Sequence, residues 1–227
     1  MLQPFGPDIW ISDGPAVNVA GFHYPTRMAV MKCANGGLFI WSPIQITSEL
    51  GAAVDQIGPV HFLVAPNSLH HLALGDWAKA YPDAKLYAAP GLVTKRKDLT
   101  FHDTLSDAGP WAEDIDQTIV LGNAITTEVV FFHKQSKTVL FTDLIQQFPN
   151  GYHTGWRGIV AKLDLMTGAE GQVPRKFRLA FTNRMAARTA IRRILAWPSD
   201  KVIIAHGQPV ISGGQAFLKR AFAWLKP

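Results

Sequence analysis

The segment 61-HFLVAPNSLHH-71 combines an apolar run with a histidine pair that follows four residues after it. Residues 61–65 are apolar almost throughout, which is typical of a strand that is covered on both faces. A Pro-Asn-Ser turn and the histidine pair follow, and a helical pattern then continues until Pro82 ends it. His70 and His71 therefore lie where a core strand passes into a helix, and such connections often carry functional residues.

Upstream of this segment, the sequence pattern predicts several strands and one helix. Residues 8–11 and 29–32 have the composition of extended segments, and residues 37–41 form a short apolar run that begins at a glycine pair. Apolar residues at helical spacing follow, with Thr47 as the N-cap and Gly58 at the end.

Downstream, two apolar runs at 128–133 and 138–142 predict a β-hairpin that ends in Asp143. Residues 201–205 predict another buried strand, and His206 follows it directly. The remaining expectations are a strand at 85–88, irregular chain at 91–107, a helix capped by Asn183 that reaches residue 197, and a last helix over 217–225. Strands interleaved with helices predict a mixed α/β or α+β layered domain.

The composition is that of a globular protein. The 227 residues, 48% of them apolar, suffice to bury one large core. No linker, low-complexity tract or internal period divides the chain, so residues 1–227 are expected to form a single domain. No apolar run reaches the length of a membrane span and no leader pattern is visible, which predicts a cytoplasmic protein. Cys33 lies in an apolar run and is expected to be buried.

The net charge of +5 suits an anionic partner, and basic residues gather in the last third of the chain. Arg184, Arg188 and Arg192 recur every four residues and share one helix face, which suits a phosphate, a carboxylate or an acidic lipid. A solvated face opposite the apolar stripe is the favoured interpretation. Motifs for nucleotide binding are missing, so no nucleic-acid partner is expected, and the oligomeric state stays open.

Three strand ends carry residues that can bind metal: His70 with His71, Asp143, and His206. Strand ends on one edge of a sheet can converge on a common pocket. Imidazole nitrogen and carboxylate oxygen are ligands of Zn²⁺ and non-haem iron, and such centres activate water. A metal centre formed by these residues would be expected to carry out hydrolytic chemistry, but the spacing alone does not favour such a centre over a cluster without metal. The alternative is that the same residues are capped or hydrogen-bonded and hold no metal.

These segments resemble the metallo-β-lactamase superfamily. Residues 61–71 look like its strand followed by the His-x-His-x-Asp-His motif, residues 138–143 like the strand with its bridging aspartate, and residues 202–207 like the strand with its last histidine. Residues 66–92, with the EVVFFH and TDL segments, are similar to a family within that superfamily, the domain of unknown function DUF4336. The resemblance implies a four-layer αββα sandwich.

Departures from the superfamily motif fall on one of its two metal positions. Aligning His71 with the final histidine of the motif puts Pro66 and Ser68 in place of two histidines of the first site. The third histidine of that site falls near Asn123 or Ala124. The first metal position therefore lacks all three of its imidazoles.

The second metal position remains filled in this alignment. His70 replaces an aspartate there, and His71, His206 and Asp143 complete the set. The resemblance thus implies one divalent metal, Zn²⁺ in preference to Fe or Mn, or a polar cluster without metal. It implies Asp143 and His70 as the residues of catalysis. Replacing an aspartate with a neutral imidazole removes one negative charge from the site.

Tyr152, His153 and Ser68 are the expected substrate contacts, and residues 101–118 and 146–172 are expected to shape the pocket. His153 follows Asp143 by ten residues, within an aromatic loop.

Two further expectations concern residues near the predicted metal ligands. His133 is expected to face outward at the hairpin turn and not to bind metal. Trp41-Ser42-Pro43 lacks the aspartate and glycine with which the superfamily often supports its metal histidines, so no support is expected there.

Two classes of function fit these residues. One is a metal-dependent hydrolase that acts on a small molecule, for which an anionic substrate suits the charge. The other is a non-catalytic module that binds a small molecule or a protein on the same fold. A redox role, known from di-iron proteins of this fold, is disfavoured because it uses two metals.

Overall fold

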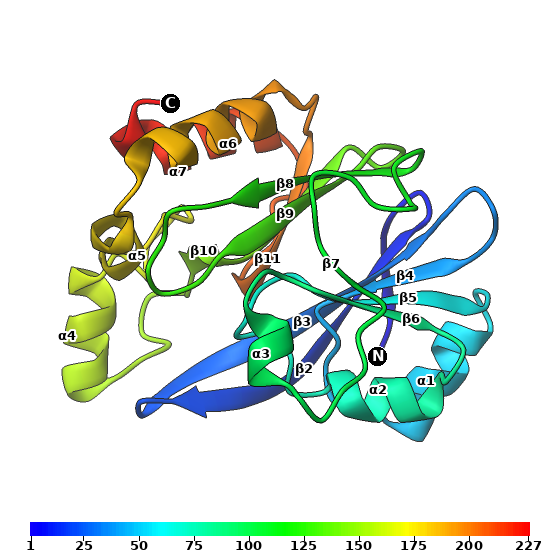
Figure 1. The fold of residues 1–227 in the computed structure, drawn as a ribbon. Coiled ribbons are helices and arrows are strands. Elements are labelled where there is room, and N and C mark those ends of the chain that lie inside the picture. The colour runs from blue at the N-terminus through cyan, green and yellow to red at the C-terminus, as the bar shows by residue number, and fades with distance from the viewer.

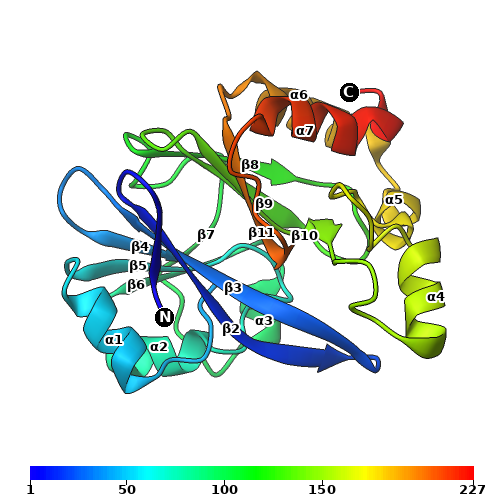
Figure 2. The ribbon, with the colours of Figure 1, turned by 180° about the vertical axis from the view of Figure 1, so that it is seen from behind.

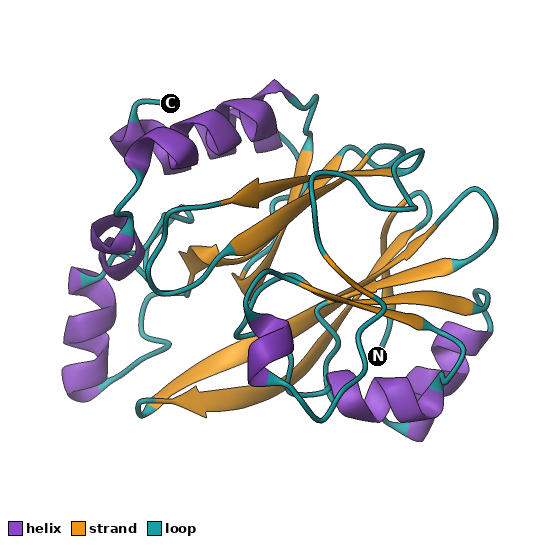
Figure 3. Ribbon diagram, in the orientation of Figure 1, coloured by secondary structure: helices purple, strands orange, loops and turns teal.

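The computed structural model describes residues 1–227 and contains two β-sheets that face each other (Figures 1 and 3). The first sheet has seven strands in chain order: β1 (Gln3–Gly6), β2 (Ile9–Val19), β3 (Phe22–Lys32), β4 (Leu38–Trp41), β5 (Val60–Ala65), β6 (Lys85–Ala88) and β7 (Asp103–Thr104). The second sheet has the order β11 (Lys201–Gly207), β10 (Thr138–Gln147), β9 (Glu128–His133) and β8 (Ile115–Val120).

Helices cover the outer faces of the two sheets, and Figure 2 shows the same layers from behind. The first sheet is covered by α1 (Ser48–Asp55) and α2 (Leu74–Ala80), and the second by α6 (Arg184–Ala196) and α7 (Gly214–Phe222). The remaining helices are α3 (Leu92–Lys95), α4 (Gly155–Leu163), α5 (Arg175–Ala180) and a 3-10 turn at Ala223–Leu225. No helix is long and apolar enough to cross a membrane.

Three apolar clusters fill the spaces between these layers. Between the sheets, the rings of Phe39 and Phe131 meet with centroids 5.3 Å apart. Trp77 is fully buried between the first sheet and its helices, and Ile191 is fully buried between the second sheet and α6. The order helix, sheet, sheet, helix confirms the expected four-layer αββα sandwich.

Most of the predicted elements are present. The strands expected at 61–65, 85–88 and 128–133 are β5, β6 and β9. The Thr47 hydroxyl accepts a hydrogen bond from Leu50 N at the start of α1, as an N-cap does. The Asn183 side chain likewise caps α6 through Ala186 N.

The structure differs from the predicted elements where the apolar pattern of the sequence is weak. Residues 8–11 and 29–32 belong to the much longer β2–β3 hairpin, whose distal half is largely exposed and so lacks a clear apolar alternation. Residues 91–107, expected to be irregular, contain α3 and the two-residue strand β7. The strands β1 and β8 and the helices α4 and α5 were not predicted.

A wide bulge in β10 shapes the end of the second sheet. Phe141 pairs with Ile204 and Gln146 with His206, so residues 142–145 lie opposite one residue of β11. Asp143 therefore lies inside a distorted strand. This corrects the expectation that Asp143 stands at the end of the strand. A bulge of this kind removes ladder hydrogen bonds and redirects side chains.

Arg27 joins the two sheets at the same end of the molecule. It is buried on β3, and its Nη1 donates to the carbonyl oxygens of Ile204 and Gly207 on β11 at 2.7 and 2.5 Å. Its Nε donates to Asp13 at 2.7 Å. This guanidinium therefore holds the end of β11 against β3.

The structure corrects the expectation for His133. Its side chain is buried and not outward-facing, and its Nδ1 lies 2.7 Å from Ser136 Oγ. The four-residue connection folds back over the ring, so the turn supplies the hydrogen-bond partner. His133 remains outside the group of metal-ligating side chains.

Candidate metal centre

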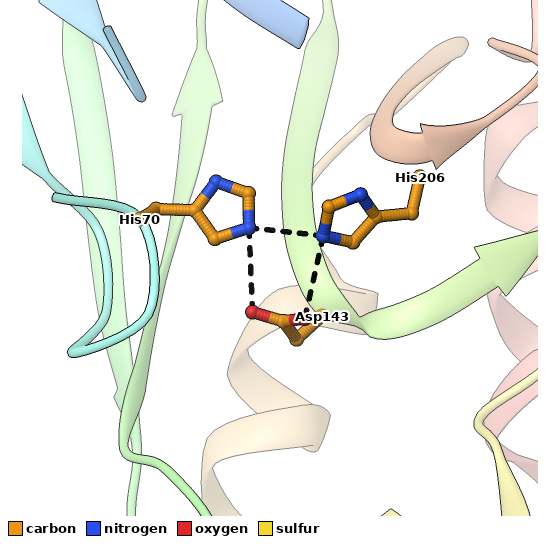
Figure 4. A group of neighbouring side chains, drawn as sticks. All are labelled: His70, Asp143 and His206. Carbon is orange, nitrogen blue, oxygen red and sulfur yellow. Dashed lines mark hydrogen bonds and ion pairs between the residues drawn. The ribbon is translucent and has the colours of Figure 1, made fainter. Parts of the chain in front are cut away.

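Three of the four predicted ligands meet at one point between the sheets (Figure 4). His70 Nε2 lies 3.1 Å from His206 Nε2 and 3.4 Å from Asp143 Oδ2. His206 Nε2 lies 3.4 Å from Asp143 Oδ1. His70 comes from the loop after β5, Asp143 from the β10 bulge and His206 from the end of β11. All three side chains are at least nine-tenths buried.

The spacing of these donor atoms fits a metal ion. Ligands about 2.0–2.1 Å from a tetrahedral Zn²⁺ lie roughly 3.4 Å from one another. The separations of 3.1, 3.4 and 3.4 Å match that geometry. By contrast, charge-assisted hydrogen bonds from imidazole to carboxylate are about 2.7–2.9 Å long, shorter than either contact with Asp143. Two imidazoles and one carboxylate also form a donor set that Zn²⁺ prefers.

The tautomer of His206 suits a ligand role. Its Nδ1 lies 2.7 Å from the Pro25 carbonyl oxygen, which can only accept a hydrogen bond. Nδ1 therefore carries a proton, and Nε2 is the ring nitrogen that faces His70 and Asp143. The Tyr24 ring packs edge-on against this imidazole with centroids 5.2 Å apart. Both contacts fix the ring orientation.

His70 is held from two sides. Its Nδ1 lies 2.7 Å from Ser42 Oγ, and its backbone N–H donates to the Asn67 side-chain oxygen at 2.9 Å. Ser42 thus supports a candidate ligand histidine, which corrects the expectation that the Trp41-Ser42-Pro43 segment gives no such support. A hydroxyl at this distance can replace the carboxylate that commonly orients a metal-binding imidazole.

Asp143 is positioned through Glu128 and Asn67. The Glu128 carboxylate is fully buried and accepts the backbone N–H groups of Thr142, Asp143 and Leu144 at 2.7, 2.9 and 3.0 Å. These are donors that the bulge releases from strand pairing. Asn67 Nδ2 donates to Asp143 Oδ2 at 2.6 Å, which directs the carboxylate toward the two imidazoles.

The electrostatics of the centre favour a carboxylate anion at Asp143 beside a neutral His70 ring. Burial raises the pKa of Asp143, but His70 and His206 outweigh burial and hold this pKa well below its usual range. Burial lowers the pKa of His70, and the charge of Asp143 opposes that effect only in part. Burial and the charge of Asp143 raise the pKa of Glu128 to about 7, against the effect of the three amides. A metal ligand must be deprotonated, and Asp143 and His70 meet this condition at neutral pH.

The structure places the fourth predicted ligand, His71, outside the group. Its Nδ1 lies 3.1 Å from Arg96 Nη1, and its carbonyl oxygen accepts from the same nitrogen at 2.8 Å. Burial, followed by the charges of Lys95 and Arg96, lowers the pKa of His71 to about 4. The candidate ligand set thus has two imidazoles and one carboxylate, not three imidazoles and one carboxylate.

The predicted substrate contacts are spread over a wider area. Ser68 Oγ lies 3.2 Å from Thr126 Oγ1 and forms no hydrogen bond with the side chains of His70, Asp143 or His206. Tyr152 is partly exposed and stacks on Phe148. His153 is buried, and its Nε2 has no hydrogen-bond partner.

One of the two segments expected to shape a pocket, residues 101–118, supplies most of the lining of two surface hollows. Neither hollow is lined by His70, Asp143 or His206.

Several residues around the candidate metal centre were not predicted from the sequence. Asn67 and Glu128 make the hydrogen bonds described above, and Tyr24 contacts His206. Gln146, beside His206 in the sheet, is buried with no partner for its amide. Only Glu128 offered a signal, because an acidic residue at the start of the apolar run 128–133 is unusual. The other three are ordinary polar residues until the strands meet.

Comparisons with known proteins agree with this architecture. Among solved structures, a metallo-β-lactamase from Pontibacter korlensis matches with a TM-score of 0.66 and 14% identity over 100% of this chain and 98% of that chain. One from Hirschia baltica matches with a TM-score of 0.66 and 13% identity over 99% and 96%. One from Erythrobacter litoralis matches with a TM-score of 0.62 and 11% identity over 99% and 91%.

At such low identity these structures establish the fold alone. No curated protein matches the chain. A family model, the domain of unknown function DUF4336, matches residues 8–157, which include two of the three residues of the centre. The chain therefore belongs to the DUF4336 family and has the metallo-β-lactamase fold.

Proposed function

We propose that this protein is a metal-dependent hydrolase with a single metal ion, bound by His70, Asp143 and His206. The observation that carries the proposal is the convergence of three buried donor atoms at separations that match the ligands of one ion. The metallo-β-lactamase fold supports it, because proteins named for hydrolysis share this architecture. Zn²⁺ is the preferred ion, and Fe or Mn are the alternatives with this donor set.

The chain's own residues have distinct tasks in this centre. Asp143 supplies the negative charge, and its lowered pKa suits a permanent ligand better than a general base, which needs a pKa near the working pH. His70 and His206 are held by Ser42 and Pro25, so each ring presents Nε2. A divalent metal held there supplies Lewis acidity and makes water nucleophilic at neutral pH.

Three protein ligands leave a coordination position open, as catalytic zinc sites do and structural zinc sites do not. The donors at the positions of the lost first site are missing, since Ser68 turns to Thr126 and the Asn123 amide donates to the Phe177 carbonyl oxygen. This arrangement supports one metal and not two. A small molecule with an anionic group is the proposed substrate, because the protein has a net charge of +5.

The second candidate function is a non-catalytic binding module whose polar cluster holds no metal. The 3.1 Å separation of the two Nε2 atoms, which fits a metal centre, also fits this module, because a proton shared between them would give the same distance. The two candidates differ in one measurable property, the affinity for metal.

Metal content and calorimetric titration distinguish them. Chelator-treated protein is titrated with Zn²⁺, Mn²⁺ and Fe²⁺, and we expect about one equivalent of Zn²⁺, as for a catalytic site with three protein ligands. His206→Gln and Asp143→Asn should abolish tight binding. His71→Gln should retain it, because His71 lies against Arg96. His133→Gln is a control for a buried histidine far from the centre.

Hydrolysis of chromogenic ester, amide and phosphodiester probes is then measured with and without the bound metal. Failure of the parent to bind any of the three ions would overturn the metal centre and favour the binding module. Metal binding without hydrolysis of any probe class would retain the centre and remove the hydrolase.

A further inference from the structure

Helix α4 directs its large apolar side chains into solvent. Trp156, Ile159, Val160 and Leu163 are 55, 63, 40 and 61% exposed. Their spacing of three, four and seven residues places them on one face of the helix. In an ordinary surface helix this stripe would face the core. We call these four residues the α4 stripe.

The opposite side of α4 is built for close approach to the protein. Its residues there are small: Ala161 is fully buried against Phe148 and Met166, and Gly158 lies over the His153 carbonyl. A Cβ at Gly158 would lie 2.6 Å from that carbonyl oxygen. A larger side chain does not fit at Gly158, and Ala161 is already buried, so the small residues of α4 pack on the protein and the stripe faces solvent. The exposure is a property of the packing.

Positive charge borders the α4 stripe. At 3.6 residues per turn, Arg157 and Lys162 project on either side of it. Residues 152–180 contain five basic and two acidic residues, and Asp164 is paired with Lys176 at 3.2 Å. An apolar stripe between cations is the pattern of helices that lie in the interface of an anionic membrane.

The α4 stripe is connected to the candidate metal centre through aromatic side chains. The Trp156 ring contacts Phe22 with centroids 5.6 Å apart, and Phe22 contacts His153 at 5.2 Å. Farther along β3, Tyr24 contacts His206. Arg157 Nε donates to the Gly21 carbonyl at 2.6 Å, which joins α4 to the tip of the β2–β3 hairpin. Figures 1 and 2 show α4 and this tip at the same end of the molecule.

We propose that α4 docks the protein onto an anionic lipid bilayer, with the α4 stripe inserted among the headgroups and the flanking cations against lipid phosphates. A second copy of this chain is the other occupant to consider. A symmetric contact through α4 would place Arg157 and Lys162 of the two copies close together, and like charges oppose such a contact. An anionic bilayer can take up the apolar stripe among its headgroups and pair the flanking cations with its phosphates.

The test is sedimentation with vesicles of phosphatidylcholine alone and of phosphatidylcholine with phosphatidylglycerol. We expect binding to the anionic vesicles only, and a fall in binding as salt is raised. Ile159→Asn with Leu163→Asn should reduce binding at least tenfold. Arg175 is exposed, and its backbone N–H donates to the Asp164 carbonyl oxygen at 2.9 Å, which places it at the end of α4. Lys162→Gln with Arg175→Gln should reduce binding about 25-fold, since about 1 kcal/mol, or fivefold, is expected per cation near the surface.

The matched control is Ile211→Asn, because Ile211 is exposed to a similar degree but lies outside the α4 stripe. It should bind as the parent does. All substituted side chains are exposed, and thermal unfolding checks that each variant folds. A blue shift of tryptophan fluorescence on binding, lost in Trp156→Phe, would place the stripe in the bilayer.

Absence of binding to anionic vesicles would overturn the proposal, and so would equal binding to both vesicle types. Concentration-dependent dimers that disappear in the Ile159→Asn, Leu163→Asn variant, without vesicle binding, would assign the surface to a second copy instead. None of these measurements depends on metal or on hydrolysis, so their outcome is independent of the proposed function.

Discussion

The Nδ1 atom of His206 lies 2.7 Å from the carbonyl oxygen of Pro25, which links the last strand of one sheet to a central strand of the other. This contact fixes the tautomer that a metal ligand at Nε2 requires. It also makes the orientation of His206 depend on how the sheets are packed. Arg27 strengthens the same junction through two carbonyl groups of β11.

Ser42→Ala should weaken metal binding without unfolding the protein. Its hydroxyl is the partner of His70 Nδ1, and loss of such a partner typically costs about 10- to 100-fold in metal affinity. Calorimetric titration with Zn²⁺ measures the change. Ser68→Ala is the control on the same loop, because Ser68 bonds to Thr126 and not to a candidate ligand. Equal affinity of Ser42→Ala and the parent would contradict the orienting role.

Glu128→Gln should destabilise the protein by about 2–3 kcal/mol, since an amide cannot accept all three backbone donors that the carboxylate accepts and buried donors without partners are costly. Urea unfolding measures the free energy. Glu113→Gln, at an exposed position, is the matched control and should change stability little. A parent-like midpoint in Glu128→Gln would show that the bulge has another support.

Asn67→Asp should destabilise the protein by about 3 kcal/mol or more, because it places an unpaired carboxylate against Asp143 in a buried site. A bound cation offsets this repulsion, so Zn²⁺ should raise the melting temperature of the variant more than that of the parent. Thermal unfolding with and without Zn²⁺ checks this. The same substitution at the exposed Asn18 should show neither effect.

Acid should destabilise the protein in part through His133. Burial lowers the pKa of this residue from 6.5 to about 4, so the unfolded chain takes up a proton before the folded one does. The associated stability is complete above pH 6.5 and is lost as the pH falls toward 4, by up to roughly 3 kcal/mol. In His133→Gln the unfolding free energy should depend less on pH across this window. His102→Gln, at an exposed position, should keep the parent's pH dependence.

The core strands and the types of candidate ligand follow from local patterns in the amino-acid sequence. Apolar runs such as 61–65 and 128–133 become buried strands because hydrophobic burial acts locally along a chain. His70, Asp143 and His206 follow or interrupt such runs, so their convergence could be predicted from topology. Resemblance added the four-layer arrangement, which the structure confirms.

The choice between His70 and His71 as a candidate ligand depends on tertiary contacts. Neighbouring residues in a loop point in different directions, and the loop is held by Asn67 from within and by Arg96 from a distant segment. The same holds for the carboxylate of Glu128, whose three backbone partners appear only once β10 bulges. Long-range contacts of this kind leave no periodic signal. The apolar face of α4 turned to water because small residues, not large ones, fit beneath the helix.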